Sequence, residues 1–125
     1  MPIACIIVTP RAEALEAFTK GLAATGELTV EVMDNEDAAL AKVKGAKPGL
    51  VIVDEDLPGH KPLALVKAVV MTNAMFNTAV ITATDPDTFE DESEGYGVLR
   101  PIPFEPSEED GRSLCEKAVD VIGKQ

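Results

Sequence analysis

The run from Gly49 to Gly59 constrains the fold of this 125-residue chain more than any other stretch. Its apolar part, Leu50 to Val53, contains no polar residue, so the strand that it predicts is buried on both faces. Strands of this kind belong to parallel sheets with helices on each side. Asp54 follows at once, at the carboxyl end of the strand, where open α/β sheets hold their ligands. The run therefore predicts an α/β domain with a carboxylate at its functional edge.

Strand-like and helix-like segments alternate along the rest of the chain. Apolar or alternating runs predict strands over residues 3–8, 28–33, 50–53, 78–82 and 96–99. Apolar residues at helical spacing predict helices over residues 10–24, 34–45, 61–74 and 107–123. This alternation predicts a doubly wound, five-stranded parallel sheet with helices on both faces and right-handed crossovers. Because 125 residues is the size of one domain, residues 1–125 are expected to form a single α/β unit.

Three residues are expected to cap helices: Thr9 the first helix, Asp34 the second and Ser107 the last. Residues 83–95 differ from the other segments, because carboxylates crowd them and Phe89 is almost their only apolar side chain. A helix here would bury little apolar surface, and its carboxylates would repel one another. We expect a loop, or at most a short helix around Phe89, so the fourth helix of the fold should be short or missing.

The composition limits the possible partners and compartment. Lys and Arg number 11 against 22 Asp and Glu, which gives a net charge of −11. This charge repels nucleic acid and anionic membranes, so we expect neither, and a protein partner should present Lys or Arg. Cys5 and Cys115 lie in apolar segments and are expected to be buried free thiols in a reducing compartment. With no leader-like N-terminus and no apolar run of membrane length, a cytoplasmic location is expected.

Three short motifs share the pattern of one family. Leu50 to Asp54 leads into Leu57-Pro58-Gly59, Thr82-Ala83 ends a strand-like run, and Arg100-Pro101 follows the last predicted strand. Together they resemble the receiver domain of bacterial response regulators, a flavodoxin-like fold of two-component signalling and phosphorelay pathways. Arg100-Pro101 stands where that family has Lys-Pro joined by a cis bond. The resemblance therefore makes the Arg100–Pro101 peptide a candidate cis bond.

The resemblance implies a role for several side chains. In that family an aspartate carboxylate takes a phosphoryl group, a divalent cation neutralises the phosphoryl oxygens, and a lysine and a hydroxyl hold the product. By this resemblance Asp54 is the phosphoacceptor, Thr82 supplies the hydroxyl and Arg100 stands in the place of the lysine. Asp54 and Asp56 would be the ligands of a Mg²⁺ ion, Asp56 through its backbone carbonyl.

Two parts of the family's site are changed in this chain. Thr9-Pro10 occupies the place of an acidic pair and cannot supply the negative oxygens that Mg²⁺ requires. The planar guanidinium of Arg100 is not equivalent to a compact ammonium. Arg100 is expected either to form a permanent ion pair with Asp54 or to form a surface salt bridge. These differences predict a degenerate receiver, or pseudo-receiver, with impaired or absent Mg²⁺-dependent phosphorylation.

For several of these side chains a purely structural role is the alternative to a functional one. Asp54 can be an ion-paired or capping carboxylate, and Thr82 an ordinary strand end. His60 is expected to be solvated in its Pro/Gly loop, and the acidic residues 83–95 form either a solvated loop or a docking site. Three apolar side chains are expected to fill the core or a helix end, or to form an exposed dimerisation patch: Met71, Met75 and Phe76.

Three functions remain open. The first is a stand-alone, non-enzymatic signalling module without a cofactor, which binds a protein partner with a basic surface or forms a homodimer. That partner would be a histidine kinase or a downstream signalling protein. The second is a working response regulator phosphorylated at Asp54 with the help of Mg²⁺. The third is a small binding protein that holds an anion or a nucleotide at the strand ends, where Arg11 on the first helical turn could contact the anion.

Overall fold

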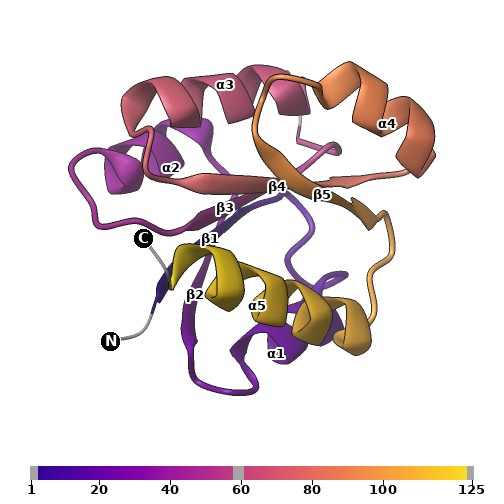
Figure 1. Cartoon of the computed structure of the whole chain (residues 1–125). Coiled ribbons are helices and arrows are strands. Elements are labelled where there is room, and N and C mark those ends of the chain that lie inside the picture. The colour runs from indigo at the N-terminus through magenta and orange to yellow at the C-terminus, as the bar shows by residue number, and fades with distance from the viewer. Residues whose placement is uncertain (1–2, 58–60, 124–125) are drawn as a thin grey trace.

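The computed structural model describes residues 3–57 and 61–123 (Figure 1). Its single sheet is parallel throughout, with the strand order β2-β1-β3-β4-β5. The strands are β1 (Ile3–Val8), β2 (Leu28–Met33), β3 (Leu50–Asp54), β4 (Asn77–Thr82) and β5 (Val98–Pro103). The helices are α1 (Glu16–Ala23), α2 (Glu36–Val43), α3 (Pro62–Thr72), α4 (Pro86–Ser93) and α5 (Glu108–Ile122). The predicted doubly wound sheet is confirmed.

The helices form two layers that enclose the sheet. Helices α1 and α5 cover one face, and α2, α3 and α4 cover the other (Figure 1). Strand β3 lies in the middle and every one of its residues is buried, as its uninterrupted apolar run predicts. Alternate residues of β3 point to opposite faces: Leu50 and Ile52 pack in the α1/α5 layer, whereas Val51 and Val53 pack in the other. The carboxyl end of β3 is thereby held in the centre of the sheet edge.

Two glycines bring α1 and α5 into backbone contact. A Cβ atom on Gly21 would overlap the carbonyl oxygen of Glu108, and one on Gly111 would overlap the carbonyl oxygen of Phe18. Only glycine allows helices to approach this closely, because any side chain would force the two backbones apart. The N-terminal part of α5 is therefore fixed against α1.

Two helix starts differ from the prediction. Helix α1 begins at Glu16 rather than near Pro10, so Thr9 lies too far before it to be its cap. The Thr9 hydroxyl accepts from the Arg11 N–H at 3.1 Å and donates to Asp54. Helix α2 is capped by Asn35 rather than Asp34, since the Asn35 side chain accepts a hydrogen bond of 2.9 Å from the Ala38 backbone N–H. The N-cap position of α1 is Leu15, which makes no side-chain cap bond, whereas Asp34 and Asn35 are residue types that cap equally well, so local pattern does not separate those two.

Ser107 caps α5 as predicted. Its hydroxyl accepts from the Asp110 N–H at 3.1 Å, and the Asp110 carboxylate accepts from the Ser107 N–H at 2.8 Å. This reciprocal pair is a capping box, which satisfies two backbone donors at once. Three acidic residues in the first turn of α5 add favourable charge at the positive end of the helix dipole.

The acidic stretch contains a short fourth helix rather than only a loop. Helix α4 is capped by Asp85, whose carboxylate accepts from the N–H groups of Asp87 and Thr88, and Phe89 is its one buried residue. A helix here is thus held by its cap and by a single apolar anchor, which is why it stays short.

The Arg100–Pro101 bond was a candidate cis peptide, and that prediction is wrong, because the described residues contain no cis peptide bond. Pro101 instead continues strand β5 and pairs with Val80, after an irregularity in the register between β4 and β5. The trans form is the intrinsically favoured one and keeps the strand extended here.

Within residues 3–57 and 61–123, each helix is too short or too polar to span a bilayer.

Candidate functional site

Asp54 ends β3 and is completely buried, with 0% of its surface exposed. Its Oδ2 accepts a hydrogen bond of 2.7 Å from the Thr9 hydroxyl and one of 2.6 Å from Nε of Arg11. Its Oδ1 accepts from Nη2 of Arg11 at 3.1 Å and from the backbone N–H of Asp56 at 3.1 Å. Each oxygen therefore has two donors. A buried carboxylate needs this degree of satisfaction, because an unpaired charge in the interior is very costly.

Arg11 is the cation that neutralises Asp54. Its Nε and Nη2 contact both carboxylate oxygens in the two-point geometry that makes such pairs strong. Nη2 also donates to the carbonyl oxygen of Phe104 at 2.7 Å, and the guanidinium carbon lies 3.8 Å from the centroid of the Phe104 ring. Only 16% of the Arg11 side chain is exposed. Arg11 thus lies between Asp54 and Phe104 and covers the carboxylate from the solvent side.

Arg100 does not form the ion pair that was considered for it. Its Nη1 donates to the hydroxyl of Ser113 on α5 at 3.0 Å, and it is not among the hydrogen-bond partners of Asp54. The reason is its position along β5. Pro103 is the residue that pairs with Thr82 at the carboxyl edge, so Arg100 lies well inside the strand. Arg11, considered from sequence only as a possible anion contact, takes the position instead.

Thr82 is held by Glu55 rather than facing Asp54. The Thr82 hydroxyl donates to Oε2 of Glu55 at 2.6 Å, and the backbone N–H of Ala83 donates to Oε1 at 2.7 Å. The backbone N–H of Glu55 in turn donates to the carbonyl oxygen of Ile81 at 3.0 Å. Glu55 therefore ties the segment after β3 to the segment after β4. Sequence reasoning assigned no role to Glu55, although its place directly after Asp54 at a strand end was a usable signal.

The fold places these residues in a known structural class. No protein-family model matches the chain, and no curated protein matches it. Among solved structures, a CheY-like response regulator receiver domain protein from Methanospirillum hungatei JF-1 superposes with a TM-score of 0.81 at 18% identity, over 99% of this chain and 98% of that one. A response regulator from Thermotoga maritima has a TM-score of 0.75 at 20% identity, over 98% of this chain and 99% of that one.

This chain has the receiver-domain fold. A third solved structure, the chemotaxis response regulator CheY4 of Vibrio cholerae, has a TM-score of 0.78 at 17% identity over 94% of this chain and 99% of that one. The identities are low, so the likeness concerns the fold and its sheet order. The resemblance of the sequence motifs and the likeness of the fold agree on the same class.

The residues at the sheet edge of this receiver fold do not fit a magnesium ion. Thr9 is bound to Asp54 as a hydrogen-bond donor, and both Asp54 oxygens are in contact with the cationic guanidinium of Arg11. Asp56 contributes its N–H to Asp54, while its side chain is exposed. Across the described residues, no three His, Cys, Asp or Glu side chains are grouped so that they could hold a metal. A hard dication needs several free oxygens, and here the guanidinium occupies the space beside the carboxylate.

The structure also describes the two cysteines and the three apolar side chains singled out from the sequence. Cys5 and Cys115 are buried and free, as predicted, and burial raises the pKa of the Cys5 thiol to about 12. Pro58, Gly59 and His60 lie outside the described residues. Phe76 is buried, whereas Met71 and Met75 are exposed.

Proposed function

We propose that this chain is a receiver-like signalling module that acts by binding a protein partner, with Asp54 serving as a structural ion-paired carboxylate. In this proposal the module catalyses no turnover and the phosphoryl switch of receiver domains is impaired or absent. Support comes from the receiver fold and from one feature of the site, the two-point contact of Arg11 with Asp54.

The Arg11 contact opposes phosphoryl transfer for a chemical reason. A carboxylate nucleophile must present a lone pair to phosphorus in line with the leaving group. Both Asp54 oxygens already accept two hydrogen bonds each, and the Phe104 ring and carbonyl hold Arg11 in place. The phosphoryl oxygens also need a cation beside them, but the positive charge of Arg11 is already neutralised by the Asp54 carboxylate.

The energy needed to free Asp54 supports the same conclusion. Breaking a buried ion pair by removing one partner costs about 3–5 kcal/mol. Moving Arg11 away from Asp54 would cost a similar amount, so an open carboxylate would be populated at about one part in a hundred or less. Phosphorylation through that minor state would be correspondingly slow.

The charge of the chain supports the choice of partner. A net charge of −11 favours association with a basic protein surface, which it also steers toward the module. A histidine kinase or a downstream signalling protein with such a surface fits the proposal. The same charge opposes self-association, so a homodimer is the less favoured form.

Intact-protein mass spectrometry after incubation with acetyl phosphate and Mg²⁺ tests the proposal. The expected result is no phosphoryl adduct, measured beside a phosphorylatable receiver domain as positive control. An adduct on the wild-type protein that Asp54→Asn removes would overturn the proposal and establish the alternative, a working response regulator phosphorylated at Asp54.

A further inference from the structure

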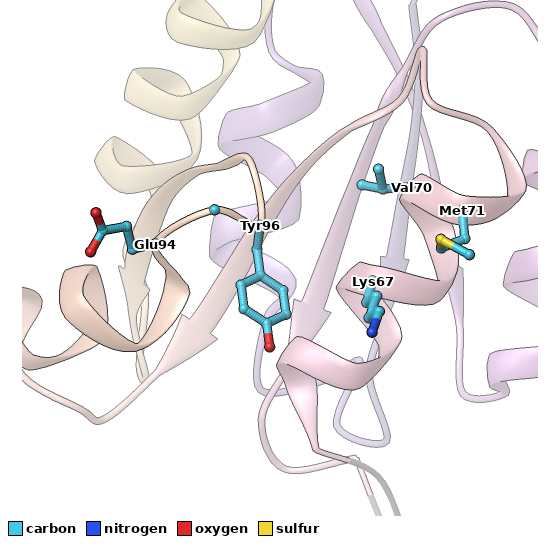
Figure 2. Close-up of a pocket in the computed structure, with 6 residues that line it drawn as sticks. Lys67, Val70, Met71, Glu94 and Tyr96 are labelled. Carbon is cyan, nitrogen blue, oxygen red and sulfur yellow. The ribbon is translucent and has the colours of Figure 1, made fainter.

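A second feature of the surface lies away from Asp54, between α3 and the segment that joins α4 to β5. It is a pocket of ≈ 240 Å³, lined by Lys67, Val70, Met71, Glu94, Gly95 and Tyr96. Figure 2 shows the Tyr96 side chain, from the segment before β5, on one side of this pocket and the α3 side chains on the other. We name it the Met71 pocket.

The Met71 pocket carries the most exposed large apolar side chain of the described residues. Met71 is 79% exposed, and Met75, four residues further along the chain, is 49% exposed. Met71 belongs to α3, in which Val66 and Val69 are fully buried, whereas Met75 lies just after the helix. A methionine side chain is flexible and polarizable, so it adapts to irregular apolar partners. An exposed pair of this kind next to a pocket is a feature of protein-binding surfaces.

One wall of this surface is strongly acidic. A second hollow of ≈ 460 Å³, lined partly by Glu90 and Asp91, shares Glu94 and Gly95 with the Met71 pocket. The chain has no Lys or Arg between Lys67 and Arg100, and six acidic residues in that interval are all exposed: Asp85, Asp87, Glu90, Asp91, Glu92 and Glu94. The Met71 pocket and the acidic hollow thus adjoin at Glu94 and Gly95.

We infer that this surface binds a basic amphipathic segment of a partner protein. An apolar side chain of the segment enters the Met71 pocket between Met71 and Tyr96, and neighbouring Lys or Arg side chains lie over the acidic hollow. Apolar contact supplies the anchor, and the opposite charges set the orientation and speed of association. The inference rests on the proposed function, to which it adds the location of the docking site and the chemistry of its partner.

The charge of the chain separates this occupant from the alternatives. A second copy of the chain would bring another net charge of −11 and another acidic α4 to the surface, so the two would repel. A nucleic acid would be repelled in the same way. A segment with apolar and cationic side chains complements the exposed Met71 and the acidic hollow, beside a pocket that Lys67 also lines.

Methyl NMR of the ¹³C-methionine-labelled protein tests the inference. The probe is a synthetic amphipathic helical peptide with one leucine stripe flanked by Lys and Arg, and its counterpart carries Glu in place of those residues. The basic peptide is expected to shift the Met71 methyl signal while the Met33 signal on β2 stays unchanged. The acidic peptide is expected to bind at least about tenfold more weakly, and added salt should lower the affinity of the protein for the basic peptide.

Matched variants locate the contact. Met71→Gln removes the exposed apolar side chain without changing charge and should lower affinity for the basic peptide about tenfold. Val32→Gln does the same to an exposed apolar residue on β2, at the far edge of the sheet, and should leave affinity unchanged. Equal effects of the two variants, or no shift at Met71, would overturn the inference. So would a Met71 shift on concentrating the protein alone, because the occupant would then be a second copy.

The two proposals fail separately. If the basic peptide does not shift the Met71 methyl signal, the docking site is refuted, but the acetyl phosphate result still stands. A phosphoryl adduct on Asp54 refutes the proposed function, whether or not the peptide binds.

Discussion

Arg11 and Asp54, 43 residues apart in the sequence, form a two-point ion pair at the carboxyl edge of the sheet. The pair joins the segment after β1 to the end of β3, and the contact of Arg11 with the Phe104 carbonyl brings in the segment after β5. Three segments at this edge of the sheet are therefore linked through one guanidinium. Removing it should affect both the stability and the chemistry of this edge.

Arg11→Ala is expected to destabilise the protein by about 3 kcal/mol, because it leaves the fully buried Asp54 carboxylate without its cation. Urea unfolding followed by circular dichroism measures the change. Arg100→Ala is the matched control, since it loses only a contact with Ser113 and should cost about 1 kcal/mol. If the two variants lost the same stability, the Arg11–Asp54 pair would not be a main support of the edge.

A triple variant tests whether the missing metal ligands explain the proposed loss of phosphorylation. Thr9→Asp and Pro10→Asp place acidic residues after β1, and Arg11→Ala frees the oxygens of Asp54. The variant is expected to bind Mg²⁺ with a heat signal in isothermal titration calorimetry, because a set of carboxylate oxygens suits a hard dication. The wild-type protein is expected to show none. Mg²⁺ binding by the wild type with an affinity equal to that of the variant would contradict this explanation.

Gly21→Ala and Gly111→Ala are each expected to destabilise the protein by about 1–3 kcal/mol, because the added methyl groups overlap the backbone of the facing helix. On an open helix surface the same change would stabilise by about 1 kcal/mol, so the sign of the effect reports the close approach of α1 and α5. Thermal unfolding measures it. Lys117→Ala, on the exposed side of α5, is the control and should change little.

The buried Cys5 thiol predicts a pH dependence of stability. Its pKa rises from 9.0 to about 12, mainly through burial and secondarily through Cys115. Above pH 9 the unfolded chain loses this proton while the folded chain keeps it, so stability should fall as the pH rises from 9 toward 12. The slope for one proton is about 1.4 kcal/mol per pH unit. Below pH 9 this group contributes no slope.

Cys5→Ala provides the control for that dependence. Other groups titrate in the same range, so the comparison is the difference in slope between wild type and variant in urea unfolding at several pH values. Parallel profiles for the two proteins would show that Cys5 does not carry the effect.

Local pattern in the sequence predicted most of the fold. The uninterrupted apolar run of β3 predicted a central strand, and Ser107 with three acidic residues predicted the start of α5. These predictions succeeded because burial on both faces and helix capping depend on residues that are neighbours in the chain. The start of α1 was predicted wrongly because Thr9-Pro10 satisfies the local rule for a helix start, whereas the helix begins only at Glu16 and the Thr9 hydroxyl donates to Asp54, 45 positions away.

The sequence by itself determined that a carboxylate would lie at the carboxyl edge of the sheet and that the acidic pair implied there by the family resemblance was absent. Which arginine would neutralise Asp54 was decided only by the tertiary structure. Arg11 and Arg100 have the same charge and shape, and both follow or belong to strands near β3. The strand register places Arg100 inside β5, whereas Arg11 lies just beyond β1, beside Asp54 and over the ring of Phe104. Pairing between distant residues depends on where the folded strands end, and no local pattern encodes that distance.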